Sequence, residues 1–276
     1  MARNNYPTIM DPNELAQIET QIAEYNNLLD KLDEKSGSSK VEGFGRNESP
    51  RCQLENYLDI TWCYHEFAVE GIVLNHLEIK SALDDRIISD SSLIPHYEDV
   101  RAYYYGIKRI RQDRTRKRLT VTINTIKELH EIITVAGDTK SHSYRKEIPL
   151  HRQYAHDFSP PEKIPYRMRK LGEWLQSAAF RKLPPLMQGA SVHNKLMGIF
   201  PWPKNSGSLA RLVMNQILVH SGYPPIMIPS VERQTYYDNI QSDLIHDSDV
   251  RMVNFLSETL VNYLNTVIKK LSTPGI

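Results

Sequence analysis

Two polar side chains interrupt an apolar helical stretch, and both could take part in chemistry. Arg211 and Asn215 lie four residues apart in LARLVMNQILVH and therefore share one face of the expected helix. A buried, unpaired guanidinium is costly, so Arg211 needs a carboxylate or a bound anion. A turn-rich loop, FPWPKNSGS, leads into this helix, and the free N–H groups of a helix start favour anions. The residues leave two interpretations open: a phosphate-sized pocket, or a structural arginine in a salt bridge.

The helix that carries Arg211 is expected to lie at the centre of a bundle. Ser206 and Gly207 can open it, and Gly222 with the prolines after it can close it. Its apolar residues cover nearly all sides, which is typical of a buried helix. They are Leu209, Ala210, Leu212, Val213, Met214, Ile217, Leu218 and Val219.

The first helix is marked by a start signal and a single apolar face. Asp11 can cap it, Pro12 takes the first helical position, and Glu14 completes an Asp-x-x-Glu box. The apolar face consists of Leu15, Ile18, Ile22, Tyr25, Leu29 and Leu32. This face either packs against the body of the protein or pairs with a second copy as a homodimer, and about three heptads do not decide between them.

The rest of the chain reads as helices with one irregular region. Helical patterns cover roughly 51–83, 97–105, 120–136, 167–180, 186–199 and 248–271. Residues 108–118 carry seven positive charges, which form either a solvated helix end or a phosphate or partner surface. Short β-prone pieces and Pro punctuation predict a hairpin flap near 141–165.

Composition limits the classes of function. The 276 residues carry 34 Lys and Arg against 33 Asp and Glu, a net charge of +1, which argues against nucleic acid as a partner. No apolar run reaches the roughly 18 residues of a membrane span, and the start lacks the apolar core of a secretory signal. Cys52 and Cys63 alone do not suggest a disulfide scaffold or a zinc site. We therefore expect a cytoplasmic protein with no membrane partner and no metal ligands.

The loop and helix around Arg211 resemble the core motif of the Fic (Fido) family, H-P-F-x-D/E-G-N-G-R-x-x-R. This chain reads FPWPKNSGSLAR from Phe200 to Arg211. The likeness extends over roughly residues 55–265, and further pieces fit the same pattern: Leu129-His130, Tyr144-Arg145, Ser159-Pro160-Pro161, Leu171 to Leu175, Arg233 and Tyr236-Tyr237. The resemblance implies a mainly α fold, a Fic-type helical bundle with a small β-hairpin flap.

Two departures from the motif fall on the residues that do the chemistry. Fic enzymes usually transfer AMP from Mg-ATP to a hydroxyl side chain of a target protein. Phe200 stands where the family has the histidine that deprotonates this hydroxyl, and a phenyl ring cannot accept a proton. Lys204 replaces the acidic residue that holds Mg²⁺, an ion that requires oxygen ligands. We therefore expect no catalytic residue, no Mg²⁺ and no ordinary AMP transfer.

Other positions of the motif are changed or kept. Ser208 replaces the first arginine and removes one phosphate-binding fork, and Asn205 and Ser206 replace the glycine and the asparagine. Pro201, Gly207 and Arg211 match, and Trp202 is an aromatic substitute.

A second resemblance concerns the inhibitory helix of many Fic proteins, [S/T]-x-x-x-E-[G/N]. Glu70 and Gly71 fit this pattern, and Glu66 takes the Ser/Thr position. Because the family's glutamate pairs with the last arginine of the core motif, we expect Glu70 to contact Arg211 as an internal clamp. The expected layout is a helix at 1–34, a linker at 35–50, a core at 51–240 with the inhibitory-type helix near 60–75, and a C-terminal helix at 241–276.

Three functions follow in order of preference. The first is a Fic-fold pseudoenzyme, an interaction or regulatory protein that binds a protein partner. The second is a metal-independent transferase or hydrolase that binds ATP, another nucleotide or phosphate, with His193 or Glu66 as the base. Its anion site would comprise Lys204, Asn205, Ser206, Gly207, Ser208 and Arg211. The third is an ordinary protein AMP transferase.

Overall fold

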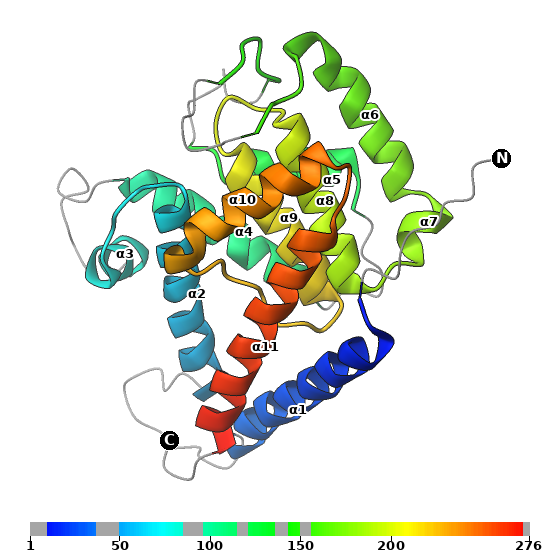
Figure 1. Ribbon diagram of the computed structural model, residues 1–276. Helices are drawn as coiled ribbons and strands as arrows, with labels where there is room; N and C mark the ends of the chain where they lie inside the picture. Colours follow the sequence, from blue (N-terminus) through cyan, green and yellow to red (C-terminus); the bar gives the residue numbers. More distant parts are fainter. Residues whose placement is uncertain are drawn as a thin grey trace.

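The computed structural model describes residues 10–36, 50–84, 96–114, 121–135, 143–149 and 156–272, and these ranges form no strand. The mainly α prediction is confirmed (Figure 1). The helices are α1 (Pro12–Ser36), α2 (Pro50–Val69), α3 (His76–Leu83), α4 (Tyr97–Asp113), α5 (Ile123–Ile132), α6 (Ile164–Leu175), α7 (Ala178–Arg181), α8 (Pro185–Ile199), α9 (Ser206–His220), α10 (Arg233–Ile245) and α11 (Val250–Ser272). Two 3-10 turns, η3 (Pro161–Lys163) and η4 (Ser230–Glu232), precede α6 and α10.

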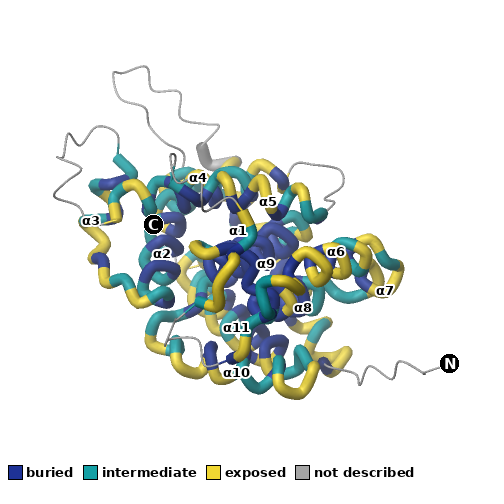
Figure 2. The backbone as a smooth tube through the Cα atoms, turned by 90° about the horizontal axis from the view of Figure 1, so that it is seen from above, coloured by how far each residue is buried: buried dark blue, intermediate teal, exposed yellow. Residues whose placement is uncertain are grey.

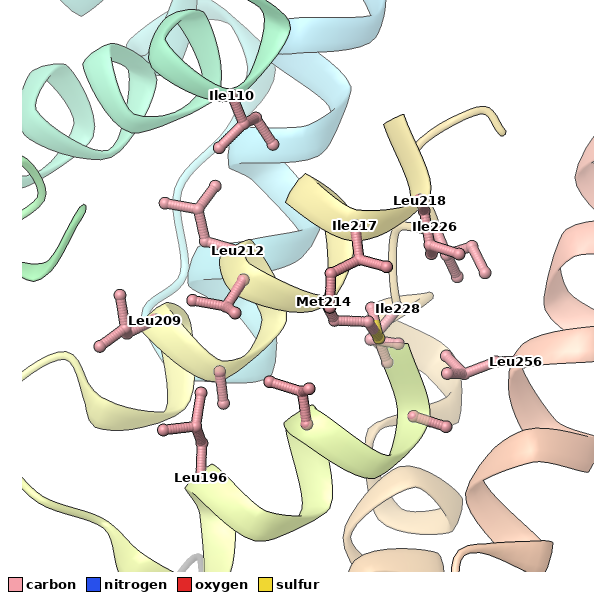
Figure 3. Close-up of a cluster of buried hydrophobic side chains, with 14 of the residues drawn as sticks. Ile110, Leu196, Leu209, Leu212, Met214, Ile217, Leu218, Ile226, Ile228 and Leu256 are labelled. Carbon is pink, nitrogen blue, oxygen red and sulfur yellow. The ribbon is translucent and has the colours of Figure 1, made fainter. Parts of the chain in front are cut away.

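Helix α9 forms the centre of the molecule, as its apolar sequence predicts. Every residue of α9 except His220 is buried, and Figure 2 shows the helix surrounded by the others. Helix α8 packs along it, α4 and α5 also contact it, and α10 and α11 pack against α8. Figure 3 shows side chains of this core, where Leu212 and Met214 of α9 lie among residues such as Ile110 of α4 and Leu256 of α11. The rigid core therefore holds the start of α9 in place.

Helix α1 packs on the body of the same chain, along α11 and α2 (Figure 1). Its apolar face is buried, and Tyr25 meets the ring of Tyr263 on α11 edge-on at 6.2 Å between centroids. The side chain of Asn26 donates to the carbonyl of Gly222 at 2.9 Å. The first of the two alternatives for this face is thus the one observed. Within the part of the chain that the structure describes, no helix combines the length and apolarity needed to cross a bilayer.

The expected helical stretch 51–83 is divided into α2 and α3 by a turn. Helix α2 ends at Val69, and Gly71 adopts φ +83° in the turn that follows, a left-handed conformation that glycine tolerates. Asn75 then caps α3 in a reciprocal pair of hydrogen bonds with Glu78, of 2.9 and 2.7 Å. Glu70 consequently lies at the end of a helix, next to an opening.

The β-hairpin flap predicted near 141–165 is wrong for the described part of that region. The backbone N–H of Arg145 donates to Pro201 O at 3.0 Å, and that of Ser159 donates to Gly198 O at 3.1 Å. Both segments therefore bond to the end of α8 and the loop after it instead of pairing with each other. Residues 150–155, with His151, and most of the expected linker lie outside the described residues.

Helix α10 was not expected from the sequence. Its residues, RQTYYDNIQSDLI, lack a continuous apolar stripe, so periodicity gives no signal. Tyr236, Tyr237 and Ile240 nevertheless bury their side chains, and this helix supplies one of the partners of Arg211.

Candidate functional site

A cavity of about 450 Å³ opens beside the start of α9. It lies between the end of α2, the start of α4 and the loop of residues 200–205 that joins α8 to α9. Its lining residues are Glu66, Phe67, Glu70, Ile72, His96, Asp99, Tyr103, Ile133, Phe200, Pro203, Lys204, Asn205, Ser206 and Ser208. The region that the sequence singled out therefore forms one wall of a pocket of ligand size.

Arg211 is held by two carboxylates, one on α2 and one on the residue directly after α2. Its Nε lies 3.1 and 2.9 Å from the two carboxylate oxygens of Glu66, and its Nη2 lies 2.5 Å from Glu66 Oε1. The same Nη2 also donates to Glu70 Oε1. The side chains of Arg211 and Glu66 are 2% and 4% exposed, whereas that of Glu70 is 19% exposed. Glu66 is thus the deeper and more fully engaged partner.

Electrostatics keep this arginine charged despite its burial. Desolvation by itself lowers the pKa of Arg211, but Glu66, Tyr236 and Glu70 together hold it well above the usual value. Tyr103 adds a hydrogen bond from its hydroxyl to Glu66 Oε2 at 3.1 Å. The pair is therefore a buried, well-satisfied ionic cluster of the kind in which loss of one partner is strongly destabilising.

Behind Arg211, away from the cavity wall, a chain of buried hydrogen bonds leads to His193. Arg211 Nη1 donates to the hydroxyl of Tyr236 at 3.0 Å, and this hydroxyl lies 2.7 Å from His193 Nε2. Asn194 continues the chain to Asp243 and Asp249, at 3.2 and 3.0 Å. Burial and the positive charge of Arg211 lower the pKa of His193 to about 3. His193 stays neutral and does not line the cavity, so it is not placed to act there as a base.

The loop after α8 places a phenyl ring on the cavity wall. Phe200 ends α8 in a left-handed conformation, φ +48°, and is 2% exposed, with its ring 4.5 Å from that of Phe158. Its carbonyl accepts a 2.6 Å hydrogen bond from Nε of the buried Arg145. The same guanidinium also bonds the carbonyls of Glu147, Ser159 and Ile199. Arg145 therefore ties the start of the loop to the neighbouring segments.

The remainder of the loop is held by a ring stack and by side-chain hydrogen bonds. His130 stacks on Trp202 at 4.3 Å, and its Nε2 lies 3.1 Å from the carbonyl of Lys204. Asn205 donates to Ile133 O at 2.9 Å and adopts φ +60°, a conformation that Asn tolerates better than most residues. The path of the loop is thus set by its contacts with α5 and the turn after α5.

Comparisons with known proteins agree with this geometry. Residues 120–218 match the Fic/DOC family model. This segment of the chain is therefore similar to the Fic/DOC family. The chain is 26% identical over 234 residues to the protein adenylyltransferase Fic of Drosophila mojavensis, an alignment that covers 83% of this chain and 45% of that protein. The chain thus matches less than half the length of this relative.

Solved structures show the same Fic fold. A Fic domain-containing signaling protein from Bacteroides thetaiotaomicron superposes with a TM-score of 0.73 and 22% identity, covering 92% of this chain and 96% of that chain. A fragment of Fic-1 from C. elegans gives a TM-score of 0.68 and 18% identity, covering 96% of this chain and 76% of that chain. The fold match covers 92% of this chain and so extends well beyond residues 120–218 of the family model.

The structure places the expected Fic motif residues in two groups. Lys204, Asn205, Ser206 and Ser208 line the cavity, whereas Gly207 and Arg211 do not. The expected contact between Glu70 and Arg211 is present.

The sequence did not predict that Glu66 is the main partner of Arg211. Glu66 was treated as a substitute at a hydroxyl position and as an alternative base, yet it is the main partner of Arg211. A signal was available, because residues four apart on a helix lie on one face. Glu66 and Glu70 therefore reach the same guanidinium.

Proposed function

We propose that this chain with the Fic fold does not transfer AMP and acts through binding, as an interaction or regulatory protein. The observation that carries the proposal is the clamp on Arg211. Each of its three nitrogens already donates to Glu66, Glu70 or Tyr236. An incoming phosphate would have to displace a buried carboxylate from this guanidinium, which is costly in a site of low dielectric.

The chemistry of the cavity wall supports the same proposal. Phe200 offers no lone pair to a proton, and loss of a general base typically costs a factor of about 10²–10⁴ in rate. Glu66 lines the wall, but its two oxygens are occupied by Arg211 and Tyr103. The wall therefore lacks an uncommitted group in the position of the family's histidine.

The charges at the cavity do not suit Mg²⁺ with a triphosphate. Lys204 puts an ammonium where the motif has an acidic residue, and a hard cation prefers oxygen ligands. Among the described residues, no group of three His, Cys, Asp or Glu side chains could hold a metal ion. Of the three carboxylates on the wall, Glu66 and Glu70 are already paired with Arg211.

A second candidate function rests on Lys204. This residue lies on the cavity wall next to the first residues of α9, where a helix start favours anions. A nucleotide or another phosphate ligand could be held there without a metal, with the ammonium as a point charge. Of the two bases suggested for such chemistry, Glu66 is at the cavity and His193 is not.

A thermal-shift scan separates these candidates. The purified protein is heated with ATP, ADP, CDP-choline or inorganic phosphate, each with and without Mg²⁺. A ligand at 100 times its Kd adds about 2.7 kcal/mol of stability, which is readily measured. We expect no shift with any of them. A shift without Mg²⁺ that is lost in Lys204→Gln supports the second candidate, and a shift with ATP that requires Mg²⁺ contradicts both.

A further inference from the structure

A second cavity, of about 270 Å³, lies where α1 meets the body of the protein. It is formed by α1, the start of α2, the end of α4 and the turn after α9, and it shares no lining residue with the cavity at the Fic motif. Three arginines line it: Arg51 of α2, Arg111 of α4 and Arg114 directly after α4. Glu55 is the only carboxylate among its described lining residues. We name it the arginine cavity.

The three guanidinium groups are unequally neutralised. Arg51 bonds Asp33 at 2.5 Å and Glu55 at 3.3 Å, and Arg111 bonds Asp59 through Nε at 2.9 Å and through Nη2. Arg114, in contrast, is exposed and makes a single long hydrogen bond of 3.4 Å to the neutral amide of Asn26. No carboxylate of the described residues lies within ion-pair distance of Arg114. Nη1 of Arg111 likewise has no partner among them. The guanidinium of Arg114 and Nη1 of Arg111 are therefore the donors without a counterion among the described residues.

Much of the remaining lining of the arginine cavity is apolar. Leu29, Leu54, Leu58 and Val219 line it, together with the two prolines after α9. Tyr223 also lines it, and the buried hydroxyl of this residue has no hydrogen-bond partner among the described residues. Ligand sites combine such apolar walls with a few polar groups that fix orientation. An unsatisfied buried hydroxyl is costly, so a hydrogen-bond partner for this one would be stabilising.

We infer that the arginine cavity binds a small organic anion, an oxyanion group attached to an apolar body. The carboxylate or phosphate would face Arg114 and Nη1 of Arg111, because a guanidinium fork matches the oxygens of either group. The apolar body would lie on the leucines and prolines. Because α1, α2, α4 and the turn after α9 all line the cavity, an occupant joins α1 to the core. This inference is independent of the function proposed for the Fic cavity.

The test uses phenyl phosphate and phenylacetate as probes, titrated calorimetrically into the full chain. Inorganic phosphate and phenol serve as comparison ligands that lack the apolar body or the charge. We expect at least one of the two probes to bind at least tenfold more tightly than both comparison ligands. Arg114→Gln should weaken that probe at least tenfold without changing the melting temperature of the unliganded protein.

Two further variants locate the binding site. Arg169→Gln removes an exposed arginine on α6, and Lys204→Gln removes the cation of the Fic cavity; both should bind the probe like the wild type. Failure of both probes to bind, equal binding by Arg114→Gln, or loss of binding in Lys204→Gln would each overturn the inference.

Discussion

At the scale of single residues, the proposed function rests on the ionic cluster of Arg211 with Glu66 and Glu70. The need for a carboxylate partner could be predicted from one arginine in an apolar helix, and the resemblance to an inhibitory helix indicated Glu70. The pairing geometry could not be predicted, because two glutamates on one helix face compete for the same guanidinium. The structure places Glu66 as the more buried of the two.

The two glutamates should differ in their contribution to stability. Glu66→Gln leaves Arg211 without its main counterion and should lower the free energy of unfolding by about 3–5 kcal/mol. Glu70→Gln removes one charged contact of a partly exposed side chain and should cost about 1–3 kcal/mol. Urea unfolding of both variants measures the order. A larger loss in Glu70→Gln would show that the cluster is not organised around Glu66.

His193 should make stability fall in mild acid. Its pKa is about 3 in the folded protein, because of burial and Arg211, against about 6.5 for a histidine in an unfolded chain. Between these values the unfolded state binds the extra proton, so the contribution is present above pH 6.5 and is lost as the pH falls towards 3. The slope is at most about 1.4 kcal/mol per pH unit. Urea unfolding from pH 7 to pH 4 should show a shallower pH dependence in His193→Gln, and identical profiles would refute this assignment.

At the scale of elements, the loop from Phe200 to Asn205 depends on segments that are distant in the sequence. The sequence predicted where this loop begins and ends, from its prolines and its glycine. It did not predict that Arg145 would bond the carbonyl of Phe200 in this loop and three further carbonyls outside it, because a hydrogen bond to a backbone carbonyl does not depend on the type of the accepting residue. For the same reason the β-prone pieces near Tyr144 were assigned to a hairpin.

Arg145→Lys should show how much the loop depends on the guanidinium group of Arg145. Lysine keeps the charge but cannot reach four separate carbonyls, so buried acceptors lose their partners, at a cost of about 1–3 kcal/mol. Arg169→Lys, on the exposed face of α6, is the matched control and should change stability by less than about 0.5 kcal/mol. Equal unfolding midpoints for the two variants would mean that the loop is held by other contacts.

The crossing of α4, α5 and α9 should be sensitive to one added methyl group. A Cβ at Gly106 would lie 2.6 Å from Ile133 Cγ2 and 2.9 Å from Leu212 Cδ2. Gly106→Ala should therefore destabilise the fold by about 1–3 kcal/mol through overpacking, although alanine favours helices. Thermal unfolding measures this loss. A more stable variant would show that the two neighbouring side chains move aside at little cost.

At the scale of the whole molecule, amphipathic periodicity was sufficient for the helical class and for the central place of α9. Periodicity could not decide whether α1 pairs with a second copy, because the same apolar face suits either partner. The structure buries that face against α11 and α2. Helix α10 was not predicted, because its buried residues, Tyr236, Tyr237, Ile240 and Asp243, form no continuous apolar stripe in a largely polar sequence.

The central proposal is that a phenyl ring and a clamped arginine leave the cavity at the Fic-like motif unable to transfer AMP. The most direct measurement is incorporation of label from ATP carrying ³²P at the α-phosphate, with Mg²⁺, into the protein itself and into the proteins of a cell lysate. We predict that neither the wild type nor Glu70→Ala gives labelling above the background measured without either protein. We also predict that Glu70→Ala folds with a lower melting temperature. Labelling by Glu70→Ala that depends on Mg²⁺ would contradict the proposal.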